Sequence, residues 1–359
     1  MGMLLTGALL RPTVIRFGRF GDMVMLTALT QALHERYGMP CQVVGAGPWN
    51  ADIFRAHPDV ARTWSLPRHL PLALNLAWPR VIAALHRTHP SPVYVCEPHQ
   101  RQLTRVRRLL KFGGIDPARC LFITDLPGRE NEHWIDRLLR FGQQTPSILE
   151  GRLGAAAASL RCSPRLQVQD SERSARDAWL RANGWYGREL VLIQAGNFRS
   201  MSGNHATAVR RAADDKAWPV QHWQRLFELI HARMPEARIA LCGASSEAPM
   251  LRGLKEAVGL DCVIVADPPL RQLFALCEVA HSMISVDTGP AHAAAALGVP
   301  LVVLYGAESP AYWLPRGPAG TAVVGLGGPP ASMRVDQLAV EAVFEAWRTL
   351  PQRGEAPVA

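Results

Sequence analysis

Short apolar runs alternate with amphipathic segments through the first half of the chain. The runs cover residues 13–17 (TVIRF), 41–46 (CQVVGA), 92–97 (PVYVCE) and 120–124 (CLFIT). Helical spacing of apolar residues follows at 23–37, 101–112 and 133–141. Strands and helices in strict turn predict a parallel sheet with helices on both faces.

The second half repeats this pattern. Apolar runs at 189–196, 238–244, 261–267, 282–287 and 301–306 alternate with helical patterns that start near residues 219, 247, 270 and 290. A stretch rich in Pro, Gly, Ser and Ala at 143–171 reads as the linker between the two halves. We therefore predict two Rossmann-like α/β domains, at 1–165 and 166–335, and a C-terminal helix and tail at 336–359.

Charge narrows the range of partners. The 359 residues include 39 Lys and Arg against 30 Asp and Glu, which gives a net charge of +9. Such an excess favours a phosphorylated substrate, nucleic acid or an anionic membrane surface. Seven cysteines without a C-x-x-C pair predict reduced thiols, and no run is long enough to span a membrane. We therefore expect a cytoplasmic protein without a disulfide framework.

The first chemical signal is the segment RFGRFGD at residues 16–22. Gly18 and Gly21 permit a tight turn after a strand, and Asp22 stands where the next helix begins. Its carboxylate could cap that helix or act as a general base. The glycine spacing is not G-x-G-x-x-G, which argues against a dinucleotide-dependent dehydrogenase.

The second signal is VDTGPAHAAAALG at residues 286–298. A strand is followed by Asp287, Thr288 and Gly289, and then by a helix that carries His292 in its first turn. The N–H groups at a helix N-terminus suit a phosphate. The alternative is structural, with Asp287 as a helix cap and His292 packed against a neighbouring loop.

Taken together, these motifs resemble glycosyltransferase family 9, the bacterial lipopolysaccharide heptosyltransferases. The GD turn and DTGPAHAAAALGVPLVVLYG carry the resemblance, supported by HWIDR at 133–137, KAWP at 216–219 and CGASSE at 242–247. The similarity extends from about Thr13 to Trp347. It implies the GT-B architecture, in which the two parallel sheets face a central cleft, and an inverting transfer from a nucleotide-activated heptose, with ADP-heptose as the expected donor.

The resemblance also implies roles for individual residues. Asp22 matches the catalytic base, Lys216 a contact to the donor phosphates and Glu247 an acid that binds the ribose hydroxyls. The family's donor-binding turn corresponds to Asp287, Thr288 and Gly289 of this sequence, and His292 lies beside them. No D-x-D motif is present, so we expect transfer without a metal or other cofactor.

The acceptor side departs from the family pattern. Arg16 and Arg19 stand in a loop where many members carry Lys and two serines, so both are candidate acceptor contacts. One helical face carries Arg101, Arg105 and Arg108, which are candidate contacts for a phosphorylated, lipid-linked or glycan acceptor. The same face suits an anionic inner membrane surface, to which we expect the protein to attach peripherally. No nucleic-acid-binding module is visible.

The sequence leaves undecided the role of one segment and the choice between the transferase and two alternative functions. Residues 197–217 form an arginine-rich insertion, including Arg199, Arg210 and Arg211, which could gate the donor or simply be solvated. The chemistry could also be that of another sugar transferase or a sugar-nucleotide epimerase. A binding protein without turnover is the remaining alternative.

Overall fold

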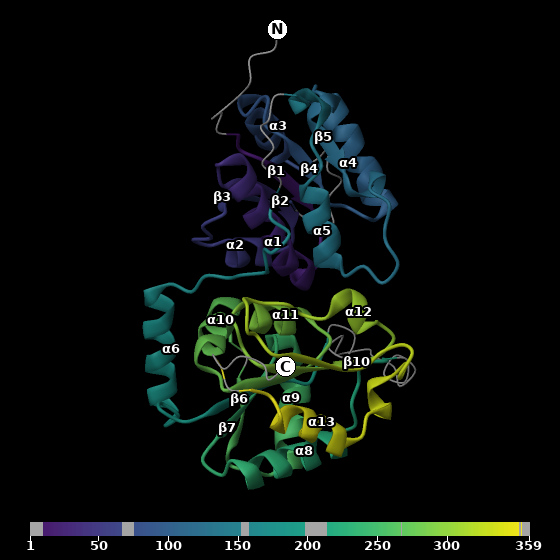
Figure 1. Cartoon of the computed structure of the whole chain (residues 1–359). Helices are drawn as coiled ribbons and strands as arrows, with labels where there is room; N and C mark the ends of the chain where they lie inside the picture. The colour runs from purple at the N-terminus through teal and green to yellow at the C-terminus, as the bar shows by residue number, and fades with distance from the viewer. Residues whose placement is uncertain are drawn as a thin grey trace. The chain divides into compact units, whose positions relative to one another are not determined.

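The computed structural model describes residues 10–66, 75–151, 158–197, 214–266, 268–351 and 353. The chain divides into two compact units, Met1–Gln167 and Val168–Ala359. Each unit is an α/β sandwich around its own parallel sheet (Figure 1).

The described part of the first unit holds a five-stranded parallel sheet in the order β3-β2-β1-β4-β5. Its strands are β1 (Thr13–Arg16), β2 (Cys41–Ala46), β3 (Val60–Leu66), β4 (Val93–Val95) and β5 (Cys120–Phe122). Every residue of the three central strands is buried, as expected for a parallel sheet covered on both faces.

Alternate strand residues of the first unit pack against different helices. The described helices are α1 (Phe20–Tyr37), α2 (Trp49–Ile53), α3 (Trp78–Arg87), α4 (Gln100–Phe112) and α5 (Trp134–Gly142). Ile15, Val44 and Val95 face α3 and α4 in one apolar cluster. Tyr94 points the other way, its ring 5.4 Å from Phe141 of α5 and its hydroxyl bonded to that of Tyr37 of α1.

The described part of the second unit holds a six-stranded parallel sheet in the order β11-β10-β9-β6-β7-β8. Its strands are β6 (Leu190–Gln194), β7 (Arg238–Cys242), β8 (Val263–Ala266), β9 (Ser282–Val286), β10 (Leu301–Tyr305) and β11 (Val323–Gly327). Its helices are α6 (Asp170–Ala182), α8 (Val220–Arg233), α9 (Ala248–Val258), α10 (Leu270–Val279), α11 (Gly289–Ala296), α12 (Pro310–Trp313) and α13 (Val340–Arg348).

Two apolar clusters sandwich this second sheet. Helices α8, α9 and α13 pack on one face, and α6, α10 and α11 on the other (Figure 1). The alanines of α11 are almost completely buried, which lets this helix lie close to β9 and β10. The turn that precedes α11 is therefore fixed against the middle of the sheet.

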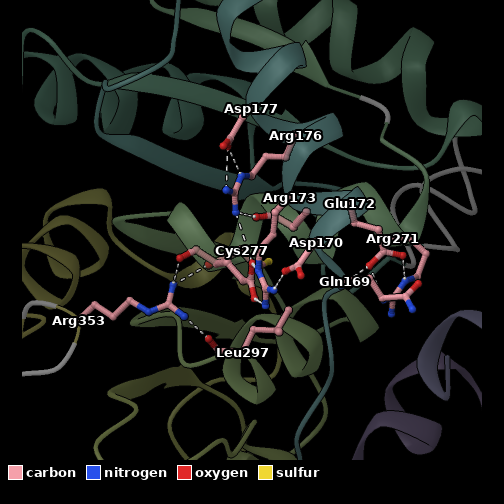
Figure 2. A network of polar contacts seen from close by, with 12 residues as sticks. Gln169, Asp170, Glu172, Arg173, Arg176, Asp177, Arg271, Cys277, Leu297 and Arg353 are labelled. Carbon is pink, nitrogen blue, oxygen red and sulfur yellow. Dashed lines mark hydrogen bonds and ion pairs between the residues drawn. The ribbon is translucent and has the colours of Figure 1, made fainter. Parts of the chain in front are cut away.

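Ion pairs fasten α6 to α10 (Figure 2). Arg173 binds both carboxylate oxygens of Glu278 at 2.7 and 2.9 Å. Arg271 of α10 pairs in the same forked way with Glu172 of α6. Arg353 donates to the carbonyls of Cys277 and Leu297, at the ends of α10 and α11. The segment that joins the two units thus enters the second unit on a helix clamped at several points.

The nine strands predicted from apolar runs are confirmed in position. The sequence interpretation missed two others, β3 and β11, which are both edge strands. In β3 only the two terminal residues are buried, and β11 contains Gly325 and Gly327, so neither has the continuous buried run of a central strand. Among the described helices, none is long and apolar enough to cross a membrane.

Candidate active site

The strand orders place both chemical signals at the points where the chain reverses direction across a sheet. In the first unit the chain adds β2 and β3 on one side of β1 and then β4 and β5 on the other. In the second unit the same reversal falls between β6 and β9. Open α/β sheets bind ligands beyond the carboxyl ends of the strands at such a reversal. The GD turn follows β1, and the DTG turn follows β9.

Asp22 lies in the first turn of α1. Its Oδ2 accepts a hydrogen bond from the backbone N–H of Arg19 at 2.7 Å, so the carboxylate does cap the helix. Its Oδ1 pairs with Nη2 of Arg16 at 3.1 Å, and its side chain is 18% exposed. Capping uses one oxygen and leaves the carboxylate within reach of solvent. The structural and catalytic interpretations of this residue are therefore compatible.

The loop before α1 closes tightly around this carboxylate. A Cβ on Gly18 would lie 2.5 Å from Cβ of Asp22 and 3.0 Å from Nε of Arg16, which no side chain tolerates. Arg16 itself is only 4% exposed and pairs with Asp22 and with Glu97. Of the two arginines of this loop that were predicted to contact the acceptor, Arg16 and Arg19, Arg19 alone is exposed.

Lys216 and Asp287 are 71 positions apart in the chain and meet in the second unit. Nζ of Lys216 lies 2.5 Å from Oδ2 of Asp287 and 2.9 Å from its carbonyl oxygen. The two side chains are 17% and 11% exposed. Asp287 therefore pairs with the lysine rather than capping α11. The lysine ammonium thus contacts the first residue of the turn that was predicted to bind phosphate.

The backbone around Lys216 is held by its neighbours. Oδ1 of Asp214 accepts from the Lys216 N–H at 3.2 Å and from the Asn197 side chain at 3.1 Å. Asn197 and Asp214 are both buried, and they join the two ends of the insertion. Its Arg199, Arg210 and Arg211 lie outside the described residues.

The residue at the cap position of α11 does not cap the helix with its side chain. Thr288 occupies the cap position, but its hydroxyl donates to the carbonyl of Val286 at 3.2 Å. Gly289 is the first residue of the helix, and Pro290 follows. His292, the fourth residue of the helix, is 6% exposed. This end of α11 keeps the partial positive charge that favours an anion.

Glu247 follows β7 and is almost completely buried, with 2% exposed. Its Oε2 accepts from the N–H of Ala244 at 2.6 Å, and its Oε1 from the Gln194 side chain at 3.3 Å. Burial raises the pKa of this carboxyl, and the two hydrogen bonds partly oppose that rise. A Cβ on Gly243 would lie 2.7 Å from Oε2, so a glycine at this position leaves room for the carboxylate.

The arginine face of α4 points away from the core. Leu103, Val106 and Leu110 are buried on the opposite side of the helix. Arg101 and Arg108 are exposed and Arg105 is half-buried, and none of the three forms an ion pair with another described residue. Phe112 continues the same face and is 84% exposed. The arginine face, defined here as Arg101, Arg105, Arg108 and Phe112, is thus both cationic and apolar.

Comparison with known proteins relates the second half of the chain to a known family. Residues 163–338 match the sequence model of glycosyltransferase family 9 (heptosyltransferase). This segment is a glycosyltransferase family 9 domain. It contains every residue assigned above to the donor, from Lys216 to His292, whereas Asp22 and the arginine face lie before it. Compared with curated proteins, the chain has no match.

Solved structures resemble the chain over nearly its whole length. A family 9 glycosyl transferase from Veillonella parvula shares 14% identity at a TM-score of 0.71, over 94% of this chain and 96% of that one. ADP-heptose lipopolysaccharide heptosyltransferase II of E. coli shares 18% at 0.69, over 94% and 98%. E. coli heptosyltransferase WaaC with ADP shares 21% at 0.63, over 94% and 99%. The TM-scores show the fold, which is that of the GT-B glycosyltransferases, and at these identities they show the fold alone.

Two residues of the site escaped the sequence interpretation. Glu97 is the last residue of the run PVYVCE, and Gln194 ends β6. Gln194 is the last residue of its strand and Glu97 lies two residues beyond β4, and both strands are next to the reversal of their sheet. A polar residue at the carboxyl end of an apolar run was therefore the available signal, but only the strand order distinguishes these two ends from the others.

Proposed function

We propose that the protein transfers a heptose from ADP-heptose to a hydroxyl of a lipopolysaccharide-type glycan acceptor, with inversion at the sugar carbon. The observation that carries this proposal is the pairing of Lys216 with Asp287, the first residue of the turn that leads into α11, within the segment that matches family 9. The choice of donor is supported by two of the related structures, the E. coli ADP-heptose lipopolysaccharide heptosyltransferase II and E. coli heptosyltransferase WaaC with ADP-2-deoxy-2-fluoro heptose.

The second unit would hold the donor. Lys216 and the N-terminus of α11 supply positive charge to the diphosphate, and this charge becomes more valuable as the bond to the sugar breaks. Because the chain itself provides these groups, we propose a transfer that needs no divalent metal. Glu247, held by Ala244 and Gln194, would accept hydrogen bonds from the ribose hydroxyls.

The first unit would activate the acceptor. The Asp22 carboxylate takes the proton of the acceptor hydroxyl while the hydroxyl oxygen bonds to the anomeric carbon and the nucleoside diphosphate leaves with the bonding electrons. Asp22 has the exposure that this role needs, and its orientation is fixed by Arg16 and by the Arg19 N–H.

We also propose peripheral attachment to an anionic membrane through the arginine face. Each basic side chain close to such a surface contributes about 1 kcal/mol, so the three arginines together contribute about 3 kcal/mol. Phe112 at the end of the face adds an apolar contact. The attachment should be reversible and sensitive to salt.

A direct test combines calorimetry with turnover. The purified protein is titrated with ADP, GDP, UDP and CDP, and it is then supplied with ADP-heptose, ADP-glucose or UDP-glucose and a deacylated lipopolysaccharide core acceptor, with and without EDTA. We expect ADP to bind most tightly and only ADP-heptose to be consumed, without loss in EDTA. Preference for another nucleotide would indicate a different transferase or an epimerase. Tight binding without turnover of any donor would indicate a binding protein.

A further inference from the structure

Glu97 is a buried carboxylate that the mechanism above does not use. It lies just beyond β4, and its side chain is 1% exposed. Its Oε1 accepts from Nη1 of Arg16 at 3.2 Å and from the His99 N–H at 3.3 Å, and its Oε2 accepts from the Phe17 N–H at 3.1 Å. Glutamate is almost never fully buried without such partners. Its contacts reach both the side chain and the backbone of the loop that leads to Asp22.

Arg16 connects this carboxylate to Asp22. Nη1 faces Glu97 and Nη2 faces Asp22 at 3.1 Å, so one planar guanidinium sits between two carboxylates. The Trp134 ring lies 5.6 Å from its Cζ. The fork of an arginine fixes the direction of both partners, which a lysine cannot do. In this row of three charges, Asp22 has the largest exposure.

We propose that Glu97 and Arg16 are positioning residues that aim the Asp22 carboxylate at the acceptor hydroxyl. The inference rests on the proposed function, because it assigns to Asp22 the proton of that hydroxyl. Arg16 is therefore removed from the candidate acceptor contacts. Its guanidinium is occupied by two carboxylates, and at 4% exposure it offers little surface to a substrate.

The location of the row favours positioning over stabilisation. Buried ion pairs give little net stability, since the cost of removing charges from water offsets their attraction. The row occupies the reversal point of the first sheet, where β1 and β4 lie side by side and where ligands bind in this class of fold. Any movement of Glu97 is transmitted to Asp22 through one side chain and through the backbone of Phe17.

The test is a double-mutant cycle in the transfer assay with Glu97→Gln, Asp22→Asn and the double variant. Glu97→Gln is expected to lower kcat at least tenfold, with KM for the acceptor and Kd for ADP within about threefold of the parent. If Glu97 acts through Asp22, the double variant is no slower than Asp22→Asn alone, because the orientation of residue 22 has no effect on kcat once its side chain can no longer accept the proton. Multiplying effects, or a near-normal kcat in Glu97→Gln, would overturn the proposal.

A matched control distinguishes an effect on the orientation of Asp22 from the general effect of neutralising a buried carboxylate. Asp59 is also a buried carboxylate of the first unit, paired with Arg165, but its carbonyl bonds to Cys41 at the opposite, amino edge of the sheet. Asp59→Asn should therefore lower the thermal stability without a selective loss of kcat. An equal loss of kcat in Asp59→Asn and Glu97→Gln would assign Glu97 a structural role only.

A second variant tests the same inference in case Glu97→Gln folds poorly. Arg16→Lys keeps the charge but removes the fork, and we expect the same loss of kcat and the same lack of additivity with Asp22→Asn. Failure of the proposed function is distinct, since the parent enzyme would then show no transfer, or Asp22→Asn would keep full turnover. A parent that transfers, an inactive Asp22→Asn and a normal Arg16→Lys would reject the positioning inference alone.

Discussion

Replacing Lys216 by alanine should weaken ADP binding, whereas neutralising its partner Asp287 should not. In the free protein the Lys216 ammonium lies 2.5 Å from the Asp287 carboxylate, and the two side chains are 17% and 11% exposed. Lys216→Ala removes the cation and leaves a negative charge, with little access to water, beside the end of α11. Asp287→Asn removes that negative charge and keeps the lysine.

The magnitude follows from these contacts. A hydrogen bond to a charged group is worth about 1.5–3 kcal/mol, and about 1.4 kcal/mol corresponds to a tenfold change in Kd. We therefore expect Lys216→Ala to bind ADP about 10- to 100-fold more weakly. Asp287→Asn should bind ADP as tightly as the parent or more tightly, because one repulsive charge near the diphosphate is gone. The two variants are thus expected to differ in the direction of their effect.

Isothermal titration calorimetry with ADP measures both effects. Lys255→Ala is the matched control, because Lys255 is an exposed lysine on α9 of the same unit. Thermal unfolding should show a loss of stability in Lys216→Ala. Removing one partner of a buried pair costs about 3–5 kcal/mol, and we expect a value below that range because water still reaches both side chains. An ADP affinity within twofold of the parent in Lys216→Ala, or an equal loss in Asp287→Asn, would refute the reasoning.

Three further outcomes are expected. Asp22→Asn should lower kcat about 100-fold or more while ADP affinity stays the same, and near-normal turnover would leave Asp22 as a helix cap only. The triple alanine variant of Arg101, Arg105 and Arg108 should lose salt-sensitive co-sedimentation with anionic vesicles without losing ADP affinity; unchanged sedimentation would assign the arginine face to solvent. Burial raises the pKa of the Glu247 carboxyl above its ordinary value of 4.5, so the unfolding free energy of the parent should fall relative to Glu247→Gln as the pH rises above about 4.5. Thermal unfolding of both proteins across pH checks this, and a constant difference would contradict it.

The fold was largely predictable because each central strand can be recognised from a short continuous stretch of sequence. A parallel strand buried on both faces appears as a continuous apolar run, and β1, β6, β9 and β10 all do. Edge strands carry no such signal. In β3, exposed residues interrupt the run, and only pairing with β2 makes it a strand.

The site was predictable in part. Asp22, Lys216, Glu247 and Asp287 could each be named because the motifs around them are short and continuous in the sequence. The sequence by itself therefore determined which residues follow strand ends and which charges they carry. Their partners depend on strand order, which is a property of the whole sheet. Only the tertiary structure brought Lys216 to Asp287 across 71 positions and Glu97 to Arg16 across 81, because β9 pairs with β6 and β4 with β1. The same packing turned Arg16 from an apparent surface cation into a buried link between two carboxylates.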